Sequence, residues 1–226
     1  EIKVEIKNLV QWEGRDVFHF VLTAESNKFL SAFYEVHDRI ESFADADELF
    51  SLKFEKILRE GDYEKDQEVI YDPVGGKAFY KEKRGEEEIQ VREKTKDSLA
   101  CFYLFRMIDL VRGSDMVFDV DSNKKHFRLH VKAEEEESVE IRNKGTFQTL
   151  RVNVDVERVE RDGTSTITPK GIILWVTNDE TRLPVKIRTK VVLGEIEMIL
   201  REDYTSMKSA GALRKEKEPS KIPASI

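Results

Sequence analysis

The chemically most capable arrangement in this sequence is a run of basic side chains at alternate positions. It comprises His126, Arg128, His130 and Lys132, interleaved with apolar residues as in a β-strand. Histidines four apart in a strand share a face but lie about 13 Å apart, too far to bind one metal ion. The helical zinc motif HExxH is absent. We therefore predict a basic exterior stripe that faces the acidic Glu134–Glu137 segment or its neighbours, with an anion-binding face as the alternative.

No residue pattern typical of an enzyme occurs in the chain. Asp and Glu make up 45 of its 226 residues, so no carboxylate spacing is specific for acid–base catalysis. The nucleophile elbow, the phosphate loop and the dinucleotide fingerprint are absent. The single cysteine, Cys101, lies among apolar residues and is predicted to be a core side chain. We predict a non-enzymatic protein with no cofactor and no metal, and keep a hydrolase as the minority hypothesis.

Polar groups that interrupt otherwise apolar segments are the candidate ligand-binding residues. A buried charge needs a partner, because leaving it unpaired costs several kcal/mol. Either these groups pair across the fold, for example Arg106 with Asp38 or Asp179, or they line the entrance of a ligand cavity. Trp175 is either a core residue or a platform for a sugar or a lipid head group. The candidates are Asp38, Arg39, Arg106, Trp175, Asn178, Asp179 and Arg182.

Alternation of apolar and polar residues dominates the chain and predicts strands. Its clearest example runs from Leu174 to Gly194, where two alternating stretches flank the polar turn at 178–182. Turn signals recur roughly every 8–12 residues, which is typical of an antiparallel meander. We predict a mostly β, antiparallel, barrel-like wall around one helix. Strands are expected at 116–120, 126–132, 138–143, 147–157, 167–177, 185–192 and 194–201, with a strand pair at 29–43.

One segment, from Ser98 to Val111, is predicted to be a helix. Asp97 can cap its first turn, and Gly113 is expected to end it in the left-handed conformation. Arg106 and Asp109 are the only charges inside it, so most of its surface must be covered. We expect it to plug the mouth of the barrel or to pack across the concave face of the sheet.

Length and charge set the domain organisation. We predict a single β-barrel-like domain over 1–204 and a basic, disordered tail over 205–226. The tail holds five Lys or Arg and two Glu, a net charge of +3, so the body carries −10 of the total of −7. An acidic body argues against nucleic acid as a partner, and no apolar run reaches the roughly 18–20 residues of a transmembrane helix. The chain opens within a strand-like run, so a signal peptide and a first strand are expected before residue 1.

Several motifs resemble one bacterial exported family, the domain of unknown function numbered three thousand one hundred and eight in its series. They are FYEVHDRIESFAD (33–45), SLKFEKILREGDY (51–63), DSLACFYLFR (97–106) and WVTNDETRLPVKI (175–187), with Ser26-Asn27, Tyr71-Asp72 and Gly194. The resemblance implies a periplasmic or outer-envelope location and an open β-barrel similar to calycin and lipid-carrier folds. It also implies one further strand before Ile2. It brings no catalytic residues.

Two hypotheses of function remain open. The first is a non-enzymatic periplasmic or envelope protein that binds an amphipathic or glycan ligand in the mouth of the barrel. The second is a structural or assembly subunit that docks another envelope protein through an edge strand or the basic tail. A continuous apolar cavity beside Trp175 and Arg106 would favour the first, and a solidly packed interior with a long open edge strand would favour the second.

Overall fold

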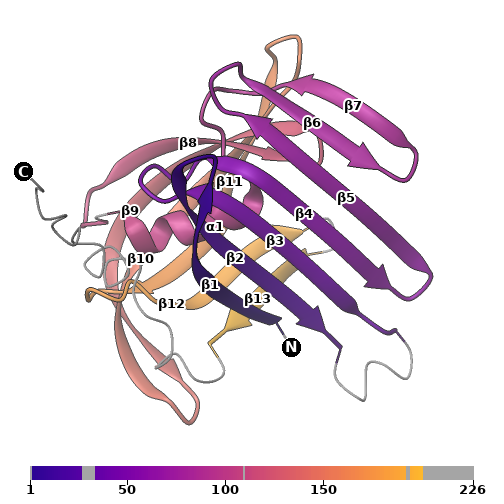
Figure 1. The fold of residues 1–226 in the computed structure, drawn as a ribbon. Coiled ribbons are helices and arrows are strands. Elements are labelled where there is room, and N and C mark those ends of the chain that lie inside the picture. Colours follow the sequence, from indigo (N-terminus) through magenta and orange to yellow (C-terminus); the bar gives the residue numbers. More distant parts are fainter. Residues whose placement is uncertain (1, 27–33, 109, 192–193, 201–226) are drawn as a thin grey trace, which may run out of the picture.

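The computed structural model describes residues 2–26, 34–108, 110–191 and 194–200 and shows a mostly β, antiparallel fold with one helix (Figure 1). The first sheet runs in chain order through β1 (Ile2–Trp12), β2 (Arg15–Glu25), β3 (His37–Asp45), β4 (Ser51–Glu60), β5 (Tyr63–Asp72), β6 (Lys77–Glu82) and β7 (Gly85–Gln90). The second contains β8 (Asp115–Ser122), β9 (Lys125–Ile141), β10 (Gly145–Val159), β11 (Ser165–Thr177), β12 (Pro184–Val191) and β13 (Gly194–Ile199). These findings confirm the predicted fold class, an open antiparallel β-barrel-like wall, although two separate sheets make up that wall.

Strand β2 explains why the first sheet must be covered on both faces. Phe18 and Phe20 point inward and join the main core of this sheet. Val17, on the opposite face, is fully buried and packs in an outer cluster with Phe50 and Leu52. Strands that are apolar on both faces need cover on both sides, and here the helix supplies part of the inner cover.

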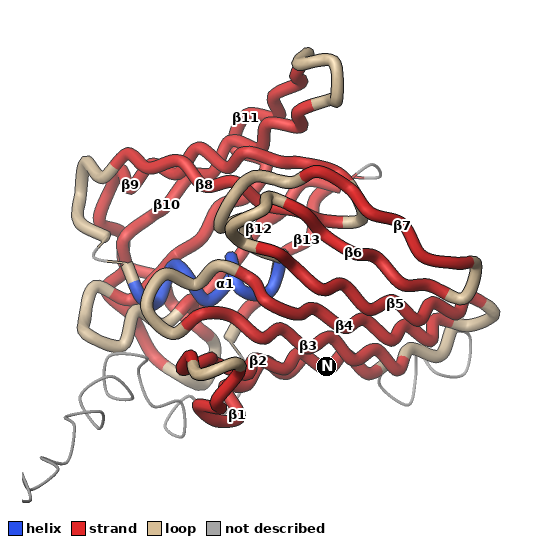
Figure 2. The backbone as a smooth tube through the Cα atoms, turned by 45° about the horizontal axis from the view of Figure 1, so that its top comes forward, coloured by secondary structure: helices blue, strands red, loops and turns tan. Residues whose placement is uncertain are grey.

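The helix α1 (Ser98–Met107) lies between the two sheets (Figure 2). One side of it, through Leu99 and Tyr103, packs into the core of the first sheet, and the other, through Cys101 and Phe105, packs into the core of the second. The sequence predicted this, because a helix with so little polar circumference must be covered on most of its surface. Cys101 is a buried free cysteine, as predicted.

Asp97 begins the helix as predicted, but the helix ends earlier than expected. The Asp97 carboxylate accepts hydrogen bonds from the backbone N–H groups of Leu99 (2.8 Å) and Ala100 (2.9 Å). The helix ends at Met107, and Ile108 already has an extended backbone. Gly113 does adopt a left-handed φ of +89°, but its N–H bonds to a carbonyl of β9, so it does not cap the helix. Because the helix ends at Met107, the chain can turn so that Leu110 is buried in the core of the second sheet.

Two strand predictions need correction. The segments 126–132 and 138–143 form one long strand, β9, which is paired with β10 through the glutamates between them. The expected strand pair at 29–43 is a single strand, β3, within the described residues, and 27–33 lie outside them. The predicted tail at 205–226 also lies outside the described residues. Among the helices that the structure describes, none is long and apolar enough to cross a membrane.

Candidate functional site

Arg106 is a buried charged side chain with few hydrogen-bond partners among the described residues. It is 5% exposed, in the last turn of α1. Its Nη2 donates to the carbonyl of Thr181 at 3.5 Å, at the limit of a hydrogen bond, while Nε and Nη1 have no partner among the described residues. Burial lowers the pKa of the guanidinium from its usual value. An arginine in this state is costly, because buried charges are normally paired and fully hydrogen-bonded.

Tyr103 places a second unpartnered donor beside Arg106. The two residues are three positions apart in α1 and therefore share a side of the helix. The Tyr103 side chain is fully buried, and its ring stacks on Phe20 of β2 with centroids 4.0 Å apart. Its hydroxyl has no hydrogen-bond partner within the described part of the chain, and burial raises its pKa. The end of the helix thus presents a guanidinium with two nitrogens, and a hydroxyl, that have no hydrogen-bond partner among the described residues.

The turn between β11 and β12 approaches Arg106 from the second sheet. Asp179 organises this turn by accepting hydrogen bonds from the Thr177 hydroxyl (2.8 Å) and the Thr181 backbone N–H (2.9 Å). Burial opposes ionisation of Asp179, but these hydrogen bonds hold its pKa below the usual value. Arg182 donates from Nη1 to the carbonyl of Leu110, just beyond the helix. The turn is therefore fixed against the end of α1.

An apolar band on the inner face of the first sheet begins beside Tyr103. Cross-strand partners form its rows, since Ile6 pairs with Phe20, Val4 with Leu22, and Leu22 with Ile40. Phe20 is buried, but Val4, Ile6, Leu22 and Ile40 are only partly buried where they pack against the core of this sheet. Ile2, one row further along β1, is 54% exposed. We call these six residues the apolar band.

Of the residues predicted from the sequence, Arg106, Asn178, Asp179 and Arg182 are brought to one place, but the expected pairing is different. Arg106 forms no ion pair with Asp38 or Asp179 and instead contacts the carbonyl of Thr181. Asn178 is near this turn and donates to Glu136 at 3.1 Å. The turn thus satisfies its own polar groups and leaves the Arg106 guanidinium largely unsatisfied.

The three other predicted residues lie elsewhere. Trp175 points away from the helix, because its neighbours Leu174 and Val176 occupy the core that contacts α1 while Trp175 packs in a separate cluster. Its indole N–H donates to Glu137 (2.7 Å), and Lys186 and Arg188 lie over its ring at 5.0 and 5.5 Å. It therefore behaves as a satisfied structural residue.

Asp38 and Arg39 lie at the start of β3, beyond the row that contains Ile40. The Asp38 carboxylate accepts from the backbone N–H of Arg59 at 3.0 Å. Arg39 pairs with Glu41 at 2.6 Å. Both side chains are engaged on the first sheet and do not contact the turn at 178–182.

The basic stripe of β9 is paired across its neighbouring strands. His126 bonds to Asp119 at 2.7 Å, and His130 bonds to Glu157 at 2.8 Å. Arg128 lies 3.5 Å from Glu157. The stripe faces acidic neighbours, as predicted, but these belong to β8 and β10 and are not the glutamates of 134–137. Within the described residues no group of His, Cys, Asp or Glu is arranged to hold a metal ion.

Sequence reasoning missed a buried polar cluster between the first sheet and the turn of the β8–β9 hairpin. Tyr71 and Tyr80 both donate to the carboxylate of Asp121, Tyr71 at 3.0 Å. The backbone N–H of Lys124 donates to the Tyr80 hydroxyl at 3.1 Å. Burial raises the pKa of both tyrosines and of Asp121. The groups come from separate elements, so no local sequence signal marks them, and their mutual hydrogen bonds indicate a link between the two sheets.

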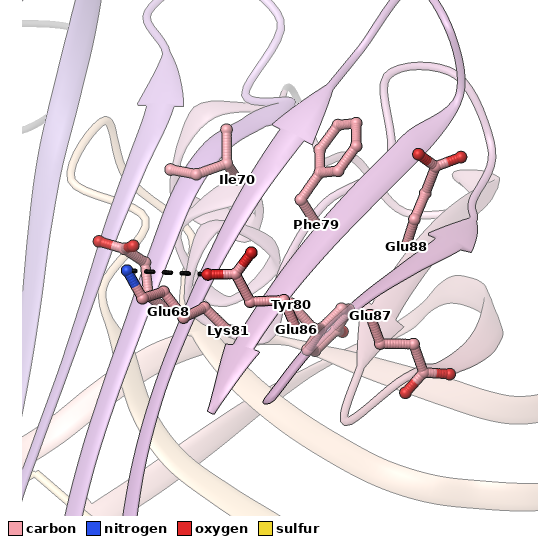
Figure 3. Close-up of a pocket in the computed structure, with 8 residues that line it drawn as sticks. All are labelled: Glu68, Ile70, Phe79, Tyr80, Lys81, Glu86, Glu87 and Glu88. Carbon is pink, nitrogen blue, oxygen red and sulfur yellow. Dashed lines mark ion pairs between the residues drawn. The ribbon is translucent and has the colours of Figure 1, made fainter. Parts of the chain in front are cut away.

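A shallow groove of about 420 Å³ crosses strands β5, β6 and β7 (Figure 3). Ile70, Phe79 and Glu88 form one row across it, and Glu68, Lys81 and Glu86 form the next. Phe79 is 42% exposed. The lining holds four glutamates and one lysine, so the groove disfavours an anionic ligand. The site at Arg106 differs from this groove, because its charged group is a cation that favours an anionic ligand.

The family of this chain is shown by a match to a family model. A family model described as "Protein of unknown function (DUF3108)" matches residues 1–201. The chain belongs to this family. The match confirms the resemblance that the sequence motifs indicated, and it brings no indication of catalysis. DUF3108 membership therefore leaves the role of the Arg106 region to be argued from its structure.

A solved structure supports the fold of this DUF3108 member. The chain is similar to a crystal structure of a β-barrel-like protein of domain of unknown function DUF1849 from Brucella abortus. The TM-score is 0.51 at 10% sequence identity, and the match covers 83% of this chain and 81% of that chain. At this identity the likeness shows a shared fold alone. No curated protein matches the chain.

Proposed function

We propose that this chain is a non-enzymatic protein of the cell envelope that binds an amphipathic ligand between α1 and the inner face of the first sheet. The proposal is carried by the presence of a buried Arg106, two of whose nitrogens have no partner among the described residues, on the same helix as Tyr103, which contacts a partly exposed apolar band. A polar donor group next to an apolar surface is complementary to a molecule with a polar head and an apolar tail. The periplasmic or outer-envelope location is part of the proposal and rests on the resemblance.

The geometry favours an amphipathic ligand over a glycan. A sugar-binding site needs an accessible aromatic platform, but Trp175 is 6% exposed, with two cationic side chains over its ring. Tyr103 is buried against Phe20, so its ring is not accessible either. The apolar band offers aliphatic side chains, which suit an acyl chain.

Native mass spectrometry of the full chain purified from the envelope of its own host tests the proposal. We expect a population whose additional mass corresponds to a lipid-like molecule, lost when the protein is delipidated. A matched sample of a variant with Leu22→Asp in the apolar band should carry much less of it. Protein that carries no bound molecule in either sample, under conditions that preserve a control lipid carrier, would contradict the proposal.

A second candidate function, docking of another envelope protein, is supported by the edge strand β13, which pairs only with β12 among the described residues. The first sheet ends in β1 and β7, and the second in β8 and β13. Strand β13 exposes Ile196 and Ile199 at 48% each, and an unpaired strand edge can add a strand from a partner. In the same experiment, a bare protein that co-purifies with one stoichiometric partner, released by Ile196→Lys, would favour this function.

A further inference from the structure

We propose that the head group of the ligand is an anion, a carboxylate or a phosphate, bound by Arg106 with help from Tyr103. This inference rests on the proposed amphipathic ligand and specifies its chemistry. The guanidinium carries five N–H donors and no acceptor, and the only bond it makes among the described residues is the 3.5 Å contact to Thr181. Groups that only donate are complementary to oxygen acceptors, and a charged donor is best satisfied by an anion.

The described acidic side chains around the site do not neutralise Arg106. Glu5 of β1 is paired with Lys3 at 3.0 Å and Lys7 at 2.9 Å. Asp179 is held by the hydroxyls and the backbone of its own turn. Within the part of the chain that the structure describes, the positive charge of Arg106 is therefore left for a ligand.

Tyr103 adds directional specificity to the site. Its hydroxyl is buried, has no partner in the described parts of the chain, and lies on the same side of the helix as Arg106. A phenol can donate to a carboxylate or phosphate oxygen that the guanidinium also contacts. Because the Tyr103 ring stacks on Phe20, Tyr103 lies where the apolar band begins. A ligand with its anionic head at Arg106 can then extend its chain over Leu22 and its neighbours in the band.

The apolar band has the dimensions of a chain-binding surface. Along β1, Ile6 and Ile2 are four positions apart, or about 13 Å at the rise of a strand. The exposed fraction of side chains increases along β1, from partly buried Ile6 to Ile2 at 54%. The band is therefore buried at the head-group end and open at the other, so an acyl chain could enter along it.

Isothermal titration of the full, delipidated chain tests the inference with three ligands that share one chain length. Laurate and monododecyl phosphate carry anionic heads, and monolaurin carries an uncharged head; all are used below the concentrations at which they aggregate. We expect one molecule of either anion per chain, bound at least tenfold more tightly than monolaurin. The order of the two anions shows whether a carboxylate or a phosphate fits better.

Variants assign the head group to its residues. Arg106→Gln should weaken both anions about tenfold to a hundredfold, the effect of losing a charged hydrogen bond, and leave monolaurin unchanged. Tyr103→Phe removes only an unpartnered oxygen, so it should fold normally and still weaken the anions severalfold. The matched control is Arg188→Gln, which lies over Trp175 away from the helix and should leave all three affinities unchanged.

The outcomes separate this inference from the proposed function. Equal affinity for monolaurin and the anions, or anion binding that survives both Arg106→Gln and Tyr103→Phe, would overturn the anionic head group and leave the amphipathic ligand standing. If Arg106→Gln does not fold, Tyr103→Phe alone decides between these results. Absence of binding by all three ligands would overturn the inference and count against the proposed function as well.

Discussion

Replacing Arg106 by methionine should stabilise the protein. Methionine has a similar length and no charge, so Arg106→Met keeps the packing of the last turn of α1 and removes a cation that is 5% exposed. Replacement of a buried ionic group by an apolar one of similar volume is neutral or stabilising by about 1–4 kcal/mol even when the group was paired. Among the described residues, the substitution removes only one hydrogen bond of Arg106, the 3.5 Å contact to the Thr181 carbonyl.

One opposing contribution reduces the expected gain. A cation in the last turn of a helix interacts favourably with the helix dipole by about 0.3–1 kcal/mol, and the variant loses this. The Thr181 residue is exposed, so water can satisfy its carbonyl after the substitution. We expect a net increase in the free energy of unfolding of about 1–2 kcal/mol, which corresponds to a rise in Tm of roughly 2–8 °C for a chain of this size.

Urea titration of delipidated protein, followed by circular dichroism, measures this change. Arg188→Met is the matched control, because Arg188 is partly exposed and pairs with Glu197 on the outer side of the second sheet. Its effect should stay within about 0.5 kcal/mol. A loss of 2 kcal/mol or more in Arg106→Met would refute the reasoning, since it would mean that the guanidinium is well paired in the ligand-free protein.

Three further predictions concern the groups that hold the fold. Asp97→Ala should lower the free energy of unfolding by roughly 3–5 kcal/mol in urea titration, because it removes a helix cap and two bonds to buried serine hydroxyls. Tyr71→Phe should cost about 1–3 kcal/mol in the same assay by removing one donor to Asp121. Hydrogen bonds from Trp175 and then Arg151 lower the pKa of Glu137, so it stabilises the fold at neutral pH and loses this effect as pH falls through its folded pKa. Glu137→Gln should therefore flatten the acid dependence of stability below pH 4.5, measured by urea titration across pH.

Each of these predictions has a control in the same chain. Asp62→Ala and Tyr63→Phe alter exposed residues of the β4–β5 hairpin and should change stability by less than about 0.5 kcal/mol. Glu135→Gln, an exposed neighbour in β9, should retain the acid dependence of the unaltered chain. Effects of Asp97→Ala or Tyr71→Phe no larger than those of their controls would show that the buried bonds are not formed. An acid profile of Glu137→Gln that matches Glu135→Gln would contradict the role given to Glu137.

Local patterns in the sequence predicted the strands and the helix with its start. Alternation identifies a strand because it records which side chains share a face, and it succeeds for β10, where Leu150, Val152 and Val154 are all buried. The cap at Asp97 was also predictable, since capping depends on the first turn alone. The end of the helix was not, because it depends on the burial of Leu110 in the second sheet, a contact between distant parts of the chain.

The glutamates of 134–137 show why local reasoning failed in β9. Four consecutive charges interrupt the alternation and suggest a break, yet the strand continues through them and stays paired with β10, with a shift of register between Leu150 and Val152. Two of them have specific partners from the second sheet: Glu136 accepts from Asn178, and Glu137 accepts from Trp175. Cross-strand partners of this kind become visible only when the pairing of strands is known.

The face occupied by Trp175 could not be read from the sequence for a related reason. Strand β11 is apolar at Leu174, Trp175 and Val176, so alternation does not show which face meets the helix. Placing Trp175 beside Arg106 required the opposite face from the one it occupies. The contact between Arg106 and the turn at 178–182 could be predicted from the sequence, because both are polar interruptions in apolar elements that must pack together.

The other described buried polar groups with unpartnered atoms are better satisfied than Arg106. Asp121 has one unpartnered carboxylate oxygen, but its other oxygen accepts from both Tyr71 and Tyr80. Asn153 also has unpartnered amide atoms, but it is uncharged, and leaving it unsatisfied costs less than leaving a cation unsatisfied. Arg151 has one free nitrogen, but it retains an ion pair with Glu137 at 3.1 Å. Asp97 accepts hydrogen bonds from four donors, so the fold can supply hydrogen-bond partners to a buried carboxyl group where structure alone requires it. The fold supplies hydrogen-bond partners to the ionisable side chain at the start of α1 and leaves the cation at its end short of them. That shortage lowers the stability of the ligand-free protein, and the geometry favours an anion bound at Arg106 as the partner that offsets this cost.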